Sequence, residues 1–223
     1  MRCLCLLIAL FAAITTVTYG QRRVLSENFD HSLDTTRWIV EAEPSPNASV
    51  AVSNGKLVLD TPGGVTVWFR RPLTGNIRIT YTRVVRVDGK INDRLSDMNQ
   101  FWMASDPSNP TLFTRTGVFE QYDSLRLYYA GIGGNTNTTS RFRKYTGHGE
   151  RHLLAEYTDA DHLLKPNHVY HIVIEVHEGV VRLFVDGVCY FAYTDPEPLR
   201  HGYFGFRATA SRQEIDDVRI YEQ

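Results

Sequence analysis

The sequence predicts an all-β protein, either a sandwich or a barrel. No long stretch after Val24 repeats its apolar residues with the period of a helix. Short runs rich in β-branched and aromatic residues alternate instead with Gly, Asn, Asp and Pro, which is the pattern of antiparallel strands joined by turns. No linker, repeat or low-complexity stretch divides the chain, so its 223 residues fit one domain of this class.

The first twenty residues predict a secretory signal peptide. Arg2 precedes a short apolar run, and small residues follow before Gln21, so we expect cleavage after Gly20. The apolar run is short for a membrane span. We therefore expect residues 21–223 to form one domain, secreted or periplasmic and not inserted in a membrane. Cys189 is the one cysteine of that segment, so it can form no disulfide within the domain.

The charge balance argues against two classes of partner. Removal of residues 1–20 takes away one arginine and no acid, which leaves 23 basic and 25 acidic residues. A nearly neutral domain lacks the basic excess that binding to nucleic acid or to an anionic membrane surface requires.

The first half of the chain reads as a series of strands. A hairpin is the clearest signal, because Asn54-Gly55 between two apolar runs favours a tight primed turn. The strands expected here lie at 25–29, 38–40, 49–52, 56–59, 65–69 and 76–87, and the segment 91–105 combines a polar loop with the end of a strand.

The segment Gly117–Tyr129 organises the functional interpretation. As a strand it would place Glu120, Tyr122, Ser124, Arg126 and Tyr128 on one face, and Phe119, Leu125, Leu127 and Tyr129 on the other. The second face suits a core. The first combines aromatic rings with polar groups, which is typical of a groove that holds a sugar, although an ordinary exposed strand face is the alternative.

The second half continues the pattern after a loop expected at 130–140. Arg141, Arg143 and Tyr145 would share one strand face, and 151–161 is interpreted as a strand although it also suits a helical turn. The segment 169–177 alternates cleanly, with its apolar residues inward. Asp186-Gly187 predicts a hairpin between 181–185 and 188–193, and the last strands are expected at 202–208 and 215–221.

Several motifs resemble one superfamily. They are Phe184-Val185-Asp186-Gly187, Asp195-Pro196-x-Pro198-Leu199, Gly202–Arg207 and Ile215–Tyr221, with Asn92–Trp102, Tyr128–Gly131 and Asn137–Arg143 in the middle of the chain. Together they resemble the concanavalin A-like lectin/glucanase superfamily, and within it domains of unknown function that Bacteroides-type bacteria export for polysaccharide breakdown. The resemblance covers nearly the whole of 21–223. It implies a jelly-roll sandwich of two curved antiparallel sheets whose concave face holds a glycan.

A polysaccharide lyase is the first functional interpretation. β-Elimination on a uronic acid needs a base for the C5 proton and a cation or amide to neutralise the carboxylate. Tyr128 is the candidate base and Arg126 the candidate neutraliser, supported by Asn99, Arg143 and Tyr145. The partner is then a polysaccharide or oligosaccharide, acidic in this interpretation. The motifs of the alginate-type jelly-roll lyases are not present as such.

Two alternatives stay open. In a binding protein without catalysis, Trp102, Tyr122, Tyr128 and Tyr145 would stack on sugars, while Arg94, Asn99, Glu120 and Arg126 would bind hydroxyl or carboxylate groups. A glycoside hydrolase needs two carboxylates about 5 to 10 Å apart. Glu120 and Asp123 would point to opposite faces of a strand, so hydrolysis would need another carboxylate pair.

Metal binding receives no firm assignment. His171, Glu175 and His177 share what we expect to be a solvent-facing strand surface. A structural calcium ion is common in the superfamily that the chain resembles, and Glu27, Asp30 and Asp216 are candidate oxygen donors. No other cofactor is expected.

Overall fold

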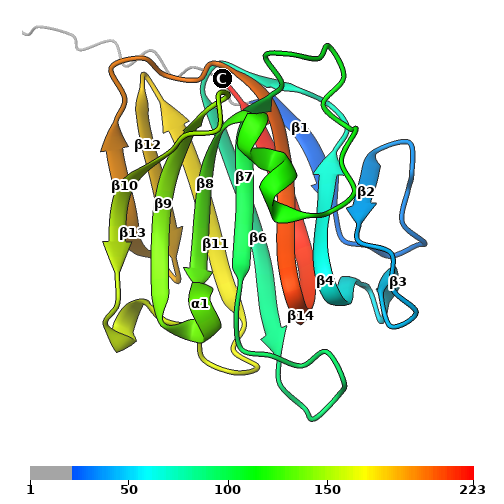
Figure 1. The fold of residues 1–223 in the computed structure, drawn as a ribbon. Coiled ribbons are helices and arrows are strands. Elements are labelled where there is room, and N and C mark those ends of the chain that lie inside the picture. Colours follow the sequence, from blue (N-terminus) through cyan, green and yellow to red (C-terminus); the bar gives the residue numbers. More distant parts are fainter. Residues whose placement is uncertain (1–21) are drawn as a thin grey trace, which may run out of the picture.

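The computed structural model describes residues 22–223, so the predicted signal peptide, residues 1–20, lies outside the described residues. The chain forms a sandwich of two packed layers of antiparallel strands (Figure 1). This arrangement confirms the predicted all-β jelly-roll sandwich. The strands are β1 (Arg22–Glu27), β2 (Trp38–Ala42), β3 (Ser49–Ser53), β4 (Lys56–Phe69), β5 (Leu73–Thr74), β6 (Ile77–Arg86), β7 (Met98–Ser105), β8 (Arg126–Gly133), β9 (Thr139–Thr146), β10 (Arg151–Tyr157), β11 (Tyr170–His177), β12 (Val180–Val185), β13 (Val188–Thr194) and β14 (His201–Glu222).

Two long strands belong to both layers. The first half of β14 pairs with β7 and with the second half of β4, while its second half pairs with β6 and β1. The front layer of Figure 1 has the order β10-β9-β8-β7-β14-β4-β2. The back layer has the order β13-β12-β11-β6-β14-β4-β3. β14 bends near Ala210, which has φ of 45° at a register shift against β4.

The main core fills the space between the layers. Strand β11 shows how the sequence produces it, because Tyr170, Ile172, Ile174 and Val176 are buried while His171 and His177 are exposed, as their alternation predicts. Trp38 and Phe206 stack at 5.9 Å between ring centroids in the same core. Burial of this continuous apolar surface is the main source of stability.

Both predicted hairpins are present. Asn54 and Gly55 have φ of 52° and 68° between β3 and β4, and Asp186 and Gly187 have φ of 50° and 82° between β12 and β13. Two consecutive positive φ angles are those of a primed turn, which matches the twist of the strands that it joins.

The structure corrects several expected element boundaries. The strands expected at 56–59 and 65–69 are the single strand β4. The segment predicted as a strand at 117–129 is a 3-10 helix, η1 (Phe119–Ser124), followed by β8, and β8 continues into the first four residues of the loop expected at 130–140. A short turn of helix, α1 (Gly134–Asn137), then leads to β9. The strands expected at 202–208 and 215–221 are one strand, β14. Another 3-10 helix, η2 (Ala160–His162), follows β10, which confirms a strand in the first part of 151–161.

Residues 112–125, which precede β8, form no strand, and side chains bind their backbone groups. Glu41 accepts the backbone N–H of Arg115 at 2.8 Å, and Gln121 accepts that of Thr116 at the same distance. The apolar residues of this segment, among them Leu112, Tyr122 and Leu125, pack onto the sheet beneath. No helix within residues 22–223 has the length and apolar character to span a membrane.

Candidate functional site

A surface segment covers part of the outer face of the front layer. Residues 106–125, which we call the cap, connect β7 to β8 and include η1, which lies in front of β14, between β7 and β4, in Figure 1. Beneath the cap is a second apolar cluster, separate from the core between the layers. The strands contribute Trp68, Phe101, Ala104, Leu127, Tyr129 and Tyr145 to it, and the cap contributes Leu112, Tyr122 and Leu125.

Charged side chains of three strands hold the cap. The buried carboxylate of Glu41 on β2 accepts hydrogen bonds from the backbone of Arg115 (2.8 Å), the Trp68 indole (2.8 Å) and the Tyr122 hydroxyl (2.9 Å). Arg151 on β10 makes two hydrogen bonds of 2.6 Å to Asp123. Paired donors and acceptors of this kind define one geometry for the segment.

Arg207 on β14 is the third of these side chains. Its guanidinium is fully buried and donates to the carbonyl of Gly117 at 2.9 Å and to the Thr66 hydroxyl at 3.1 Å. It also lies 4.8 Å from the ring centroid of Phe119 and 4.9 Å from that of Tyr122. Burial lowers the pKa of Arg207.

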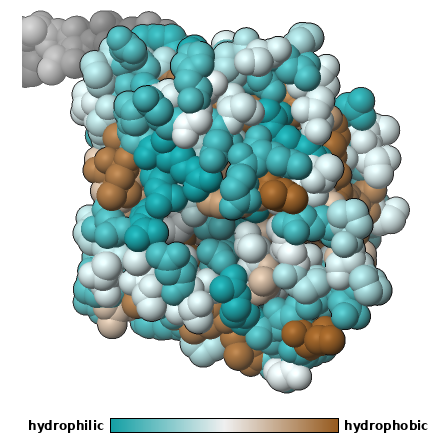
Figure 2. Space-filling view, in the orientation of Figure 1, coloured by the Kyte–Doolittle hydropathy of each residue, from teal (hydrophilic) through white to brown (hydrophobic). Residues whose placement is uncertain are grey.

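Beside the cap the front layer is hollowed. The hollow has a volume of about 370 Å³ and lies over β7, β8 and β9, between η1 and α1. The face seen in Figure 2 is mostly hydrophilic and is recessed near its middle. The lining residues are Arg94, Asp97, Asn99, Phe119, Glu120, Tyr129, Gly131, Gly134, Asn135, Thr139, Arg141, Arg143 and Thr209. We call this hollow the groove site.

The floor of the groove site is a short polar network. The Tyr129 hydroxyl donates to Asn99 Oδ1 at 3.0 Å, and it passes directly over Gly131. A Cβ atom on Gly131 would lie 2.1 Å from that hydroxyl, so glycine is required for the contact. Burial raises the pKa of Tyr129, which keeps the phenol protonated at neutral pH.

Three arginines line the groove site, and two of them are paired. Arg94 binds Asp97 on the β14 side, and Arg141 binds Glu156 on the β10 side. Arg143 forms no ion pair with any carboxylate of residues 22–223. Its guanidinium lies 5.7 Å from the ring centroid of Tyr129. A positive charge that no carboxylate of residues 22–223 pairs with therefore lies over the Tyr129 ring.

A buried arginine supports the floor from below. Arg83 on β6 donates to the carbonyls of Asn99 (2.7 Å) and Arg207 (2.8 Å), two residues that face each other across β7 and β14. A further bond joins Arg83 to Gln213 at 2.7 Å, and burial lowers the pKa of Arg83 to about 10. Arg83 thus links the back layer to the strands that carry the groove site.

The structure brings together four of the residues predicted for a site. Arg94, Asn99, Glu120 and Arg143 all line the groove site. Tyr129, Gly131, Asp97, Thr139, Arg141 and Thr209 also line it but were not predicted. The sequence does place Arg141 on the face of Arg143, so one of these could have been found by alternation alone.

The other predicted residues lie elsewhere. Trp102 and Tyr128 point into the core between the layers, and Tyr122 and Tyr145 are buried under the cap. The expected shared face of Tyr128, Arg126 and Arg143 is therefore wrong. Tyr129 is opposite Arg143 in the register of β8 and β9, and it occupies the position that Tyr128 was expected to hold.

The surroundings of Tyr128 do not suit a catalytic base. Its hydroxyl donates to the buried carboxylate of Asp195 and accepts the backbone N–H of Leu199 at 3.1 Å. Burial, with the hydrogen bond to Asp195, raises the pKa of Tyr128, so the phenolate is disfavoured. Lys144 also binds Asp195, at 2.7 Å. This cluster ties the loop after β13 to the front layer.

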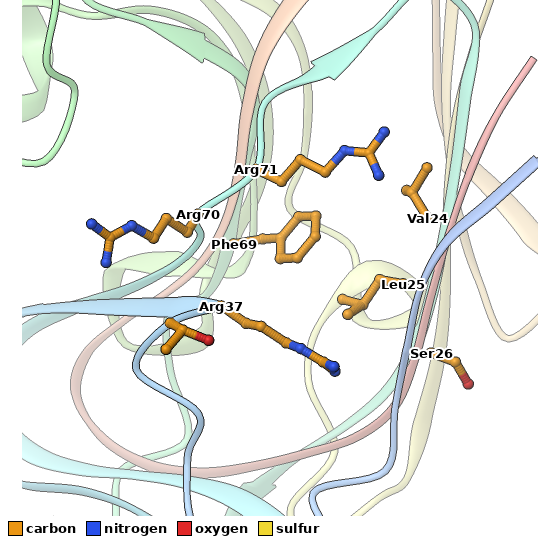
Figure 3. A pocket seen from close by; sticks show the side chains of 8 residues that line it. Val24, Leu25, Ser26, Arg37, Phe69, Arg70 and Arg71 are labelled. Atoms are coloured by element: carbon orange, nitrogen blue, oxygen red, sulfur yellow. The ribbon is translucent and has the colours of Figure 1, made fainter.

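Two further hollows lie outside the groove site and are lined by other residues. One, lined by Arg126, Lys144, His148, His152 and Tyr193 among others, lies where the loop after β13 meets β9. The other is shown in Figure 3, where Arg37 and Arg71 lie around Phe69 and Leu25. Those two arginines are paired with Asp34 and Glu222, respectively.

The candidate calcium ligands do not converge. Glu27 lies 3.8 Å from Arg37 and accepts the backbone N–H of Phe29, while Asp216 accepts that of Asp217. Among residues 22–223 no group of three His, Cys, Asp or Glu side chains could hold a metal ion. We therefore derive no role for calcium from these residues.

Comparison with solved structures shows the same fold. A Bacillus subtilis protein of unknown function with a galectin-like fold has a TM-score of 0.71 at 16% identity, covering 90% of this chain and 97% of that one. The carbohydrate-binding module CBM66 from Bacillus subtilis has a TM-score of 0.59 at 13% identity, covering 83% and 96%. An endo-β-1,3-glucanase from Pyrococcus furiosus has a TM-score of 0.60 at 11% identity, covering 91% and 94%.

Comparison with sequences identifies a family. No curated protein sequence matches the chain. A family model matches residues 59–218, which are more than half of the chain and include β7, β8, β9 and the cap. The chain therefore belongs to the family described as Domain of unknown function (DUF6250), and it has the concanavalin A-like sandwich fold.

Proposed function

We propose that this protein is an exported carbohydrate-binding protein whose groove site holds an acidic sugar of a polysaccharide. The observation that carries the proposal is Arg143, a guanidinium without a carboxylate partner in residues 22–223. It lies 5.7 Å from the ring centroid of Tyr129, and it lines the groove site with Tyr129 and Asn99. A guanidinium forms two parallel hydrogen bonds with a carboxylate, and a phenol and an amide complete the recognition of a sugar ring.

The charges of the central strands favour an acidic ligand. Strands β7, β8 and β9 contain no Asp or Glu, whereas β8 and β9 carry Arg126, Arg141, Arg143 and Lys144. Hydrolysis by a pair of carboxylates on one of these strands therefore has no candidate residues. The fold neighbours include a carbohydrate-binding module and a β-1,3-glucanase, which supports a glycan as the partner.

A polysaccharide lyase is the second candidate. Tyr129 and Arg143 supply a proton-carrying group and a neutralising cation side by side, which β-elimination from a uronic acid requires. The raised pKa of Tyr129 weighs against it, because a phenol that stays protonated is a poor base. Binding without catalysis is therefore the proposed function.

Export belongs to the same proposal. The leader predicted at 1–20 and a single domain at 21–223 would deliver the protein to the periplasm or the medium. The resemblance to domains that Bacteroides-type bacteria export for polysaccharide breakdown agrees with a glycan as the partner.

The test measures binding and elimination together. Calorimetry with polygalacturonate, alginate and laminarin is expected to show binding to an acidic polymer and none to neutral laminarin. Arg143→Gln is expected to weaken that binding about tenfold or more, because it removes a charge-assisted hydrogen bond. Arg200→Gln, at an exposed arginine away from the groove site, is the matched control.

Two results would change the assignment. Ultraviolet absorbance of an unsaturated uronate, appearing with the wild type and lost in Tyr129→Phe, would establish the lyase instead. Equal affinity of the wild type and Arg143→Gln for every polymer would remove the groove site from the proposal.

A further inference from the structure

We propose that the groove site binds the end of a glycan chain and not an internal stretch of it. This inference rests on the proposed function, since it concerns how the same site meets a polysaccharide. It follows from the position of the cap and from its attachment to the sheet. Without the cap, the outer face of the front layer would offer a long binding surface; with the cap in place, only the short groove site is left open.

The cap blocks the path that a glycan chain would take across the strands of the front layer. A chain lying over β9, β8 and β7 would have to continue over β14, β4 and β2. There the side chains of Glu41, Thr66, Trp68 and Arg207 are buried. These residues lie on the same layer as the groove site, and their burial shows that no sugar can rest on them.

The closure involves direct contact between backbones. Gly117 of the cap lies against Gly64 on β4, and a Cβ atom on Gly64 would be only 2.1 Å from the Gly117 carbonyl oxygen. Arg207 donates to that same oxygen from below. No gap for a sugar ring, which is several ångströms thick, exists between the cap and the sheet at this point.

The cap is fixed in place. Displacing it would leave the carboxylate of Glu41 without two of its three donors, Arg115 and Tyr122, and the guanidinium of Arg207 without the Gly117 carbonyl. Within the cap, the ion pair of Arg115 with Asp106, whose side chains are 7% and 6% exposed, ties the start of the segment to its middle. Unpaired buried charges cost several kcal/mol each, so the closed position is the stable one.

The groove site is small and is bordered by side chains on three sides. Its volume of about 370 Å³ is near the lower end of the range for ligand sites. The pair Arg141–Glu156 borders it toward β10, and the pair Arg94–Asp97 borders it toward β14. Phe119 and Glu120 of the cap form the third wall. A terminal sugar can enter such a site from solvent, whereas a continuous chain would need an exit on the side of the cap.

The experiment counts protein molecules per chain. Oligogalacturonides and oligoalginates from disaccharide to octasaccharide, and the parent polymers, are titrated by calorimetry. End binding predicts one protein per chain at every length, with an affinity per chain that stops rising once the site is filled. Internal binding predicts that the number of proteins per chain grows with length.

A second measurement tests the ends themselves. Borohydride converts the reducing-end sugar into an open-chain alditol, and a lyase digest gives oligosaccharides with an unsaturated non-reducing end. One of these two changes is expected to weaken binding about tenfold or more. If neither alters the affinity, or if proteins per chain increase with length, the inference is overturned while the proposed function stands. If no acidic glycan binds at all, the proposed function falls and the inference falls with it.

Discussion

Adjacent tyrosines on β8 have opposite environments. Tyr129 faces the groove site and Tyr128 faces the core, where it binds Asp195. From the sequence alone the two could not be distinguished, because the cap buries part of the outer face of β8: Leu127 is buried there, under Leu125 of the cap, although it lies outside the main core. Strand alternation therefore holds within β8, where the faces of Tyr128 and Tyr129 are the reverse of those predicted, and it does not apply to residues 119–124, which form η1.

Removing one hydroxyl oxygen at a time from Tyr128 and Tyr129 tests which of the two tyrosines belongs to the groove site. Tyr129→Phe removes a hydroxyl that lines the groove site and is expected to weaken glycan binding about fivefold; because it also removes the buried hydrogen bond to Asn99, we expect the free energy of unfolding to fall by about 1 kcal/mol. Tyr128→Phe is its matched control. It is expected to lower the free energy of unfolding by about 1 to 3 kcal/mol, because Asp195 and the Leu199 N–H lose a buried partner, while affinity is unchanged. Calorimetry and urea unfolding measure the two effects, and a loss of affinity in Tyr128→Phe alone would restore it as the site residue.

Local patterns predicted most of the strands but not the cap. Hairpins with Asn54-Gly55 and Asp186-Gly187 depend on neighbouring residues, so the sequence identifies them. The cap depends on partners far away in the chain, such as Glu41, which lies 81 residues before Tyr122. Sequence periodicity carries no information on such contacts, and the part of the cap from Gly117 to Leu125 was therefore predicted as a strand.

The attachment of the cap to the sheet can be tested through Glu41. In Glu41→Gln the side-chain amide offers one acceptor oxygen to three donors, those of Arg115, Trp68 and Tyr122. We expect the free energy of unfolding to fall by about 2 to 3 kcal/mol and limited proteolysis to cut within 106–125. Glu150→Gln, at an exposed residue, is expected to change stability by less than about 0.5 kcal/mol. Unchanged protease resistance in Glu41→Gln would show that other contacts hold the cap.

Ion pairs spread over the molecule make its stability depend on pH. The pKa of Asp195 is lowered, because hydrogen bonds from Lys144 and Tyr128 outweigh the effect of burial. The pKa of Asp93 is lowered by Arg212, and that of Glu214 is lowered because bonds from Arg86 and Lys56 outweigh its burial.

These carboxylates give up their protons more readily in the folded protein than in the unfolded chain. Their contribution is therefore complete above the unfolded pKa, about 4, and is lost as the pH falls through the lower folded values. We expect the free energy of unfolding, measured with urea, to be level from pH 7 to about pH 5 and to decline below it. Asp195→Asn should show a shallower decline than the wild type. A profile that rises toward acid would contradict these assignments.

The two layers are joined by backbone as well as by packed side chains. Because β4 and β14 each pass from one layer into the other, the sandwich is a single sheet folded over on itself. Neither half can slide or part from the other without breaking strand pairs on both sides of the bend. The spacing of Asn99, Tyr129 and Arg143 is consequently fixed before any ligand arrives, so a sugar that binds there would meet a preorganised surface and lose little affinity to rearrangement of the protein.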